Sequence, residues 1–134
     1  MGVLLDTNIL IEYERQRFDL APFIHDRATE SVCISVVSAS ELLHGVQRAL
    51  TPAGRARRQA FVEAILDRLP VLPIDLAVAR VHADLWSRLT KKGSMIGLHD
   101  SWLAATCLVH GFSVVTLNRR EFLRVPGLKV ETWR

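Results

Sequence analysis

The stretch that decides the fold class is Val3–Ile11, which reads VLLDTNILI, in a chain of 134 residues. Its first three residues are aliphatic, as in a buried strand. Asp6 follows at once, and a helix is expected to begin near Thr7. A strand that leads directly into a helix predicts a crossover to a second, parallel strand.

Four further runs have the composition of strands, and longer segments with helical spacing separate them. The runs are Val32–Ser35, Val71–Ile74, Ser113–Leu117 and Lys129–Thr132. Strands that alternate with helices predict an α/β fold, here an α/β/α sandwich around a central, mostly parallel five-stranded sheet. Two helices instead of one fit between Val32 and Val71, and we expect them to form a projecting helical hairpin.

Helix boundaries and helix faces can also be read from the sequence. Thr51-Pro52 is a cap followed by proline at a first helical position, and Gly111 is a glycine cap that closes the apolar helix His99–His110. One helix face is formed by residues at helical spacing, namely Val78, Val81, Leu85 and Leu89.

Composition limits the function classes. Hydrophobic residues make up 49% and charged residues 23%, which is typical of a folded domain and argues against disorder. We expect residues 1–134 to form one domain, and we expect no membrane anchor or signal peptide, hence a cytoplasmic protein. Cys33 and Cys107 are expected to be buried, reduced thiols. The net charge of +3 is compatible with a nucleic-acid partner.

Acidic residues follow several of the predicted strands. Asp6 ends the first strand, and Glu41 lies six residues past Ser35, where we expect the first turn of the next helix. Asp100 opens the apolar helix that precedes the fourth strand. Because the carboxyl ends of parallel strands share one edge of the sheet, these three carboxylates are expected to converge.

Each acid also has a purely structural interpretation. Asp6 can cap a helix, and Ser38–Glu41 has the spacing of a capping box in which Glu41 bonds to the Ser38 amide. Asp100 in a first turn complements the helix dipole. Taken together, three crowded carboxylates repel one another unless a cation is present, and Mg²⁺ or Mn²⁺ prefers such oxygen ligands. A cation held in this way serves phosphodiester hydrolysis best.

The runs VLLDTNILI, SASELLHG, GLHDSWLAAT and TLNRREFLRVPGL, in this order, resemble the successive motifs of PIN-domain ribonucleases, most closely VapC-type toxins. The resemblance covers about residues 3–128. It implies that Asp6, Glu41 and Asp100 are catalytic and bind the metal. It also implies that Thr116 and Asn118 line the remaining side of this metal site, which we call the fourth corner. Many relatives carry an acid where this chain has Asn118.

The resemblance further implies a metal-dependent endoribonuclease that acts as a toxin, an RNA substrate, a cognate antitoxin and a homodimer. Glu121 either supplies the missing acid of the fourth corner or faces solvent. Arg119, Arg120 and Arg124 lie near that corner in sequence and are candidates for RNA binding, with a solvated face as the alternative. The same two interpretations apply to Arg55, Arg57 and Arg58 in the predicted hairpin.

Two rival functions stay open at this point. One is a phosphatase or phosphotransferase with Asp6 as nucleophile, although the haloacid-dehalogenase pattern would require an aspartate where Asn8 stands. The other is a catalytically weak fold that binds RNA or a partner. The three retained acids argue against the second rival, and Asn118 argues weakly for it.

Overall fold

The computed structural model describes residues 2–17, 19–26 and 31–133. Twelve elements lie within the described residues, in chain order: β1 (Gly2–Leu5), α1 (Thr7–Glu14), α2 (Ala21–Asp26), β2 (Ser31–Ser35), α3 (Val36–Gln47), α4 (Pro52–Arg68), β3 (Val71–Leu72), α5 (Leu76–Lys92), α6 (Leu98–His110), β4 (Ser113–Val115), α7 (Arg119–Phe122) and β5 (Val130–Glu131).

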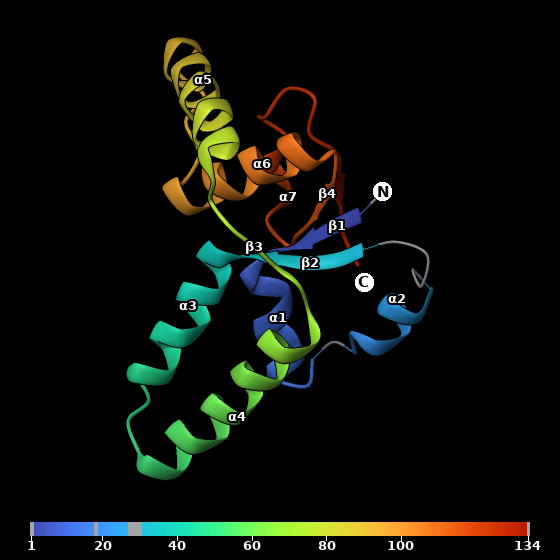
Figure 1. Ribbon diagram of the computed structural model, residues 1–134, viewed down its shortest axis with the longest axis vertical. Coiled ribbons are helices and arrows are strands. Elements are labelled where there is room, and N and C mark those ends of the chain that lie inside the picture. Colours follow the sequence, from blue (N-terminus) through green and yellow to red (C-terminus); the bar gives the residue numbers. More distant parts are fainter. Residues whose placement is uncertain (1, 18, 27–30, 134) are drawn as a thin grey trace.

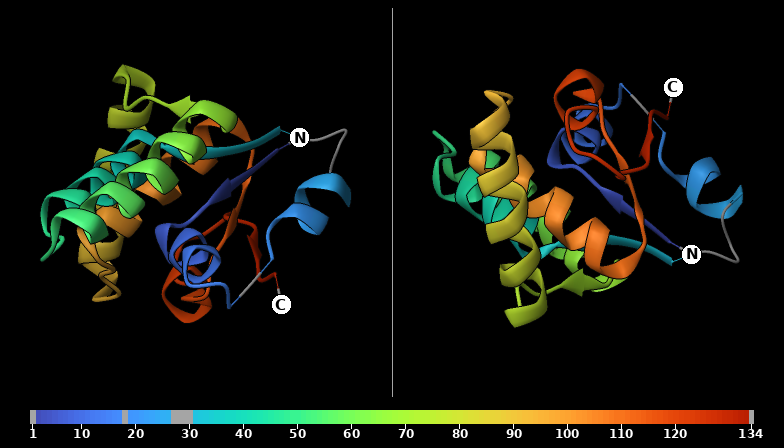
Figure 2. Two further views of the ribbon diagram at one scale, coloured as in Figure 1. Left: turned by 90° about the horizontal axis from the view of Figure 1, so that it is seen from below. Right: turned by 90° about the horizontal axis from the view of Figure 1, so that it is seen from above.

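The five strands form one sheet in the order β3-β2-β1-β4-β5, and every neighbouring pair is parallel. Helices cover both of its faces, so the predicted α/β/α sandwich is confirmed. In Figure 1, α5 and α6 lie above the sheet and α1, α3 and α4 lie below it; Figure 2 presents these two sides in turn.

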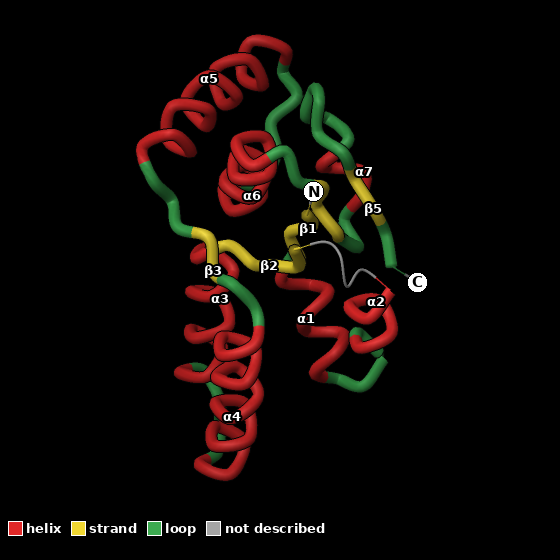
Figure 3. Tube along the Cα trace, turned by 45° about the vertical axis from the view of Figure 1, so that its right-hand side comes forward, coloured by secondary structure: helices red, strands yellow, loops and turns green. Residues whose placement is uncertain are grey.

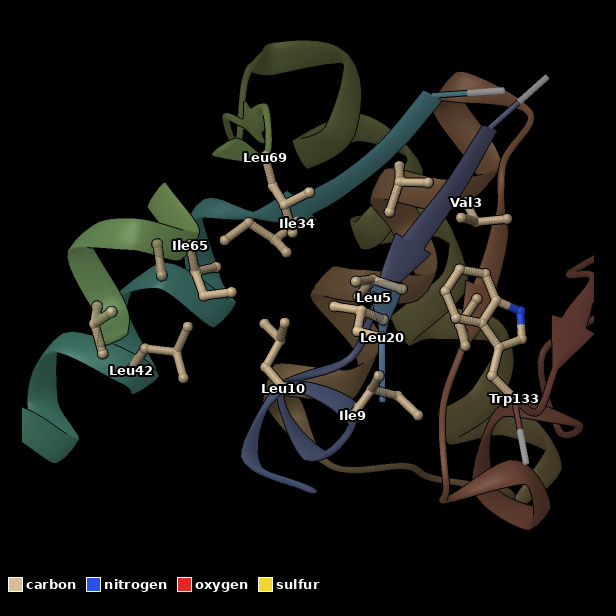
Figure 4. Close-up of a cluster of buried hydrophobic side chains, with 14 of the residues drawn as sticks. Val3, Leu5, Ile9, Leu10, Leu20, Ile34, Leu42, Ile65, Leu69 and Trp133 are labelled. Carbon is tan, nitrogen blue, oxygen red and sulfur yellow. The ribbon is translucent and has the colours of Figure 1, made fainter. Parts of the chain in front are cut away.

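Alternation along the strands builds the two halves of the core. In β1, Val3 and Leu5 join the cluster under α1, α3 and α4, whereas Leu4 faces the cluster under α5 and α6. Figure 4 shows the first of these clusters, in which Leu5 lies near Leu20. Because the sheet is buried on both faces, its strands read as continuous apolar runs.

The hairpin is formed by α3 and α4, which pack against each other and extend away from the sheet (Figure 3). Its second helix begins as the sequence predicted, since Thr51 Oγ1 accepts a hydrogen bond from the Gly54 amide at 3.0 Å. The glycine cap is also confirmed, because Gly111 closes α6 with a φ of +69°.

Two boundaries differ from the expectation. The third strand ends at Leu72 and not at Ile74, because Pro73 has no amide hydrogen to continue the ladder. The buried stripe of α5 consists of Val78, His82, Leu85 and Leu89, so His82 takes the place that we predicted for Val81. In the described part of the chain, no helix is both long and apolar enough to cross a membrane.

Candidate active site at the carboxyl ends of the strands

Asp6 lies directly after β1, at the edge where the parallel strands end. It occupies the N-cap position of α1, and the Thr7 and Asn8 amides lower its pKa, but the side chain makes no regular capping hydrogen bond. Instead, the carboxylate accepts a hydrogen bond of 2.8 Å from the Thr116 hydroxyl. The side chain is buried, with 6% exposed. Burial raises the pKa of Asp6, and the Thr116 hydrogen bond opposes that shift.

Glu41 lies in the second turn of α3, not in the first turn as we expected. The helix begins at Val36 because Ser35 is its N-cap, with the Ser35 hydroxyl accepting from the Val37 amide at 3.1 Å. The capping box from Ser38 to Glu41 is therefore wrong. The Glu41 carboxylate accepts from the Thr7 hydroxyl at 3.0 Å, and it lies 3.4 Å from His99 Nδ1.

Asp100 lies in the first turn of α6, half-buried, as the sequence predicted. Its pKa is raised to about 7, first because burial disfavours the charge and then because Asp6, Glu121 and Glu41 repel it. The three predicted acids therefore act on one another electrostatically, although 94 residues separate the first from the last.

The fourth corner is held together by Thr116, which follows β4. Its hydroxyl donates to Asp6 and accepts from the Asn118 amide at 2.8 Å and from Asn8 Nδ2 at 3.4 Å. One donor and two acceptor positions exhaust the capacity of a hydroxyl group. The orientation of Thr116, and with it that of the Asp6 carboxylate, is thereby fixed.

Asn118 and Glu121 both turn toward Asp100. Asn118 Nδ2 donates to Glu121 Oε2 at 2.6 Å and lies 3.5 Å from Asp100 Oδ2. The other oxygen of Glu121 accepts from the Gly97 amide, and this bond is the main cause that lowers the pKa of Glu121. Glu121 therefore lies beside Asn118 and Asp100, and that it supplies the missing acid stays a prediction.

The sequence did not single out Thr7 and Asn8 as members of the site. Thr7 holds Glu41, while Asn8 accepts from the Leu117 amide at 3.2 Å and so connects α1 to the chain after β4. The only sequence signal was their position directly after Asp6 in the DTN triplet. His99, beside Asp100, likewise reaches Glu41 from a neighbouring helix.

The three arginines near the corner have different environments. Arg124 is exposed, and its guanidinium donates to the Met95 carbonyl at 2.7 Å; it also contributes to the lowered pKa of Glu121. Arg119 and Arg120 are exposed in the first half of α7. All three thus lie on the surface beside the acids.

The carboxylates lie near one another but are not arranged as a complete metal-coordination site. Among the side chains that the structure describes, no three of His, Cys, Asp or Glu are close enough to hold a metal ion as they stand. The donor chemistry nevertheless suits a hard divalent cation, because Asp6, Glu41 and Asp100 all offer carboxylate oxygens and their mutual repulsion favours a positive charge between them.

A comparison of the sequence with protein-family models matches residues 3–128 to the PIN domain. The chain is 35% identical to the tRNA(fMet)-specific endonuclease VapC of Salmonella typhimurium, with 97% of this chain and 96% of that protein covered. It is 34% identical to ribonuclease VapC1 of Rickettsia felis over 98% of this chain and 96% of that protein.

Solved structures agree with these relatives. The structure of DNA-bound VapBC from Salmonella typhimurium superimposes with a TM-score of 0.91 at 30% identity, covering 100% of this chain and 99% of that one. VapBC2 from Rickettsia felis, bound to a promoter fragment, superimposes with a TM-score of 0.90 at 25% identity and covers 100% of both chains.

Proposed function

Because this chain belongs to the PIN-domain family and, within it, to the VapC ribonucleases, we propose that it hydrolyses RNA phosphodiester bonds at the corner formed by Asp6, Glu41 and Asp100. It is the toxin of a toxin–antitoxin pair and works in the cytoplasm. The observation that supports this most strongly is the convergence of the three acids at one sheet edge, with the pKa of Asp100 raised to about 7.

At the active site, we assign metal binding to the three acids and the orientation of those acids to the threonines. Asp6, Glu41 and Asp100 are the ligands for a divalent cation, Mg²⁺ or Mn²⁺. When bound, such a cation neutralises charge on the phosphate and lowers the pKa of water. Thr116 orients Asp6, and Thr7 orients Glu41. Without a cation, the Asp100 carboxyl is only partly ionised near neutral pH, because burial and the neighbouring acids raise its pKa to about 7.

At the fourth corner, this chain has the amide of Asn118 and, three residues later, the carboxylate of Glu121. Asn118 offers a neutral oxygen, and Glu121 brings a carboxylate to the same corner from α7. Arg119, Arg120 and Arg124 provide positive charge for RNA phosphates beside the acids. The partner is an antitoxin, because the structural relatives are VapBC complexes, and VapBC-5 from Mycobacterium tuberculosis belongs to a family of toxin-antitoxin systems. The toxin itself forms a homodimer.

The test compares three isosteric variants with the wild-type protein. Asp6→Asn, Glu41→Gln and Asp100→Asn are each purified free of antitoxin and incubated with labelled RNA, with EDTA or with added Mg²⁺ or Mn²⁺. We expect each variant to lose about 10²- to 10⁴-fold in cleavage rate, the size of a lost transition-state contact. Sequencing of the cleaved ends identifies the bond that is cut.

Asp84→Asn is the matched control, because Asp84 is an exposed acid of α5, paired with Arg88, and its replacement removes the same charge. Retained RNA cleavage in the three corner variants would place the active site elsewhere. Hydrolysis of a phosphate monoester, with RNA left intact, would favour the phosphatase alternative. Cleavage by none of the proteins, with RNA still bound, would favour a binding module.

A further inference from the structure

A second charged site lies at the far end of α1 and α3, away from the acids. Four arginines from three separate segments line a cleft of about 720 Å³ between the end of α1, the α3–α4 turn and the beginning of α4. We call it the arginine cleft; the four are Arg15, Arg48, Arg57 and Arg58. We propose that the arginine cleft binds the phosphate backbone of the RNA strand whose scissile bond lies at the acidic corner; this rests on the proposed function.

The charge of the cleft is poorly balanced. Glu14 is the one acid that lines it, and it pairs with Arg58 at 3.4 Å. No carboxylate lies within salt-bridge distance of Arg15, Arg48 or Arg57 in the described part of the chain. These three guanidinium groups are exposed, so they are available to an anionic ligand. Planar guanidinium groups match phosphate oxygens in a bidentate manner.

Two helices connect the acidic corner to the arginine cleft. Along α3, Glu41, Gly45 and Arg48 lie on one face at helical spacing. Gly45 lies against Arg58, because a Cβ added to it would be in van der Waals contact with Arg58 Nη1 at 3.5 Å. Seven residues of helix separate Glu41 from Arg48, which is roughly 10 Å along the axis.

The same arrangement is repeated along α1. Thr7 contacts Glu41 at one end, and Glu14 contacts Arg58 at the other, seven residues later on the same helix face. In Figure 1, α1 and α3 both run away from the sheet, and each therefore has a residue at the acids in its part nearer the sheet and an arginine at its far end. A distance on the order of 10 Å is short for a nucleic-acid strand, so one strand can occupy both sites at once.

Helix dipoles explain the positions of only two of the four arginines in the arginine cleft. Arg15 and Arg48 stand at the C-caps of α1 and α3, where a cation is favourable without any ligand. Arg57 and Arg58 lie in the second turn of α4, near the positive end of that helix, where this explanation does not apply. Their convergence with Arg48 costs repulsion, which a bound polyanion relieves.

The test uses the Arg48→Gln/Arg57→Gln double variant in the Asp6→Asn background, so that RNA is bound but not cut. Both arginines are exposed and have no carboxylate partner among the described residues, so the fold does not depend on their charge. The probes are fluorescent single-stranded RNAs, a dodecamer and a dinucleotide, titrated at several salt concentrations. Arg80→Gln/Arg88→Gln on α5 is the control with the same change in charge.

We expect the double variant to bind the dodecamer about tenfold more weakly. The slope of log affinity against log salt concentration should become shallower by roughly 1.4, the value for two single-strand phosphate contacts. The loss should be smaller for the dinucleotide, whose single phosphate cannot occupy both sites. Unchanged affinity and slope for the dodecamer overturn the proposal, and so does an equal loss in the α5 control, which would reflect net charge alone.

Failure of this proposal is distinct from failure of the proposed function. If the corner variants abolish cleavage while the arginine variants bind RNA normally, the ribonuclease assignment stands and the arginine cleft does not bind substrate. A polyglutamate peptide is the competing probe. If its binding depends on Arg48 and Arg57 while RNA binding does not, the cleft belongs to an acidic polypeptide partner and the RNA proposal is overturned.

Discussion

Replacing Asp100 by Asn should stabilise the metal-free protein at alkaline pH, although it destroys the active site. The pKa of Asp100 is about 7 in the folded protein against an ordinary 3.8. Each pKa unit corresponds to about 1.4 kcal/mol, so the shift is worth about 4 kcal/mol at most. Because Asp100 is half-buried and partly screened by solvent, we expect about 2–3 kcal/mol.

The sign of the effect follows from proton linkage. A carboxyl group with a raised pKa binds its proton more tightly in the folded state, so its contribution to stability is complete below pH 3.8 and is lost as the pH rises through about 7. At pH 5, about 1.2 of the roughly 3.2 pH units above 3.8, Asp100→Asn should be more stable than the wild-type protein by about a third of the full amount. At pH 8 the variant should be more stable by the full amount, roughly 5–15 °C in Tm.

The assay is urea unfolding followed by circular dichroism, at pH 5 and pH 8, in EDTA and in saturating Mg²⁺. In Mg²⁺ the order should reverse, because a cation that binds only the folded wild-type protein stabilises it by mass action. Asp84→Asn is the control for loss of one surface charge. An Asp100→Asn protein that is no more stable than the wild type at pH 8 in EDTA would refute the idea that the carboxylates are crowded.

Three further predictions concern the corner, the buried histidine and the assembly. Asn118→Asp should enlarge the shift in Tm that Mg²⁺ produces, since a carboxylate is a stronger ligand than an amide; an equal shift would assign the fourth corner to Glu121. Burial lowers the pKa of His82, so the wild-type protein should lose stability as the pH falls below about 6.5. Urea unfolding at pH 7 and pH 5 should show a smaller loss of stability for His82→Gln. Light scattering of the purified protein should give a dimer at micromolar concentration, and a monomer would contradict that expectation.

The fold could be predicted from local patterns. Continuous apolar strands, the Thr51-Pro52 start of α4 and the glycine cap at Gly111 each depend on a few neighbouring residues, and all three are confirmed. The start of α3 could not be predicted in this way. Ser35, Ser38 and Ser40 are all good N-cap residues, and only the end of β2 decides that Ser35 is the cap.

The site was predictable to the same extent. That Asp6, Glu41 and Asp100 meet at one edge followed from the rule for parallel sheets, because this rule needs only the order of strands and helices. The contacts from Thr7 to Glu41 and from Asn118 to Glu121 depend on the crossing of particular helices and on side-chain rotamers. The periodicity of the sequence does not predict these contacts. It also did not predict that His82 is buried, where it stacks on Trp102 with ring centroids 3.6 Å apart.

The corner as a whole is under electrostatic strain that the chain relieves only in part. Asp6 and Glu41 each receive a hydrogen bond from a threonine, and Glu121 is held by the Gly97 amide. Asp100 contacts Asn118 at 3.5 Å and shares a hydrogen bond with Glu121, but the Glu121 contact raises its pKa, and Asp100 is the acid whose pKa rises to about 7. Since an aspartate in place of Asn118 would add a further charge beside Asp100, the amide lowers the repulsion in the metal-free protein at the cost of a weaker ligand. Because burial and three neighbouring acids all oppose the charge of Asp100, this carboxylate gains strongly from a bound cation, and Asp100 should govern how strongly metal binding depends on pH.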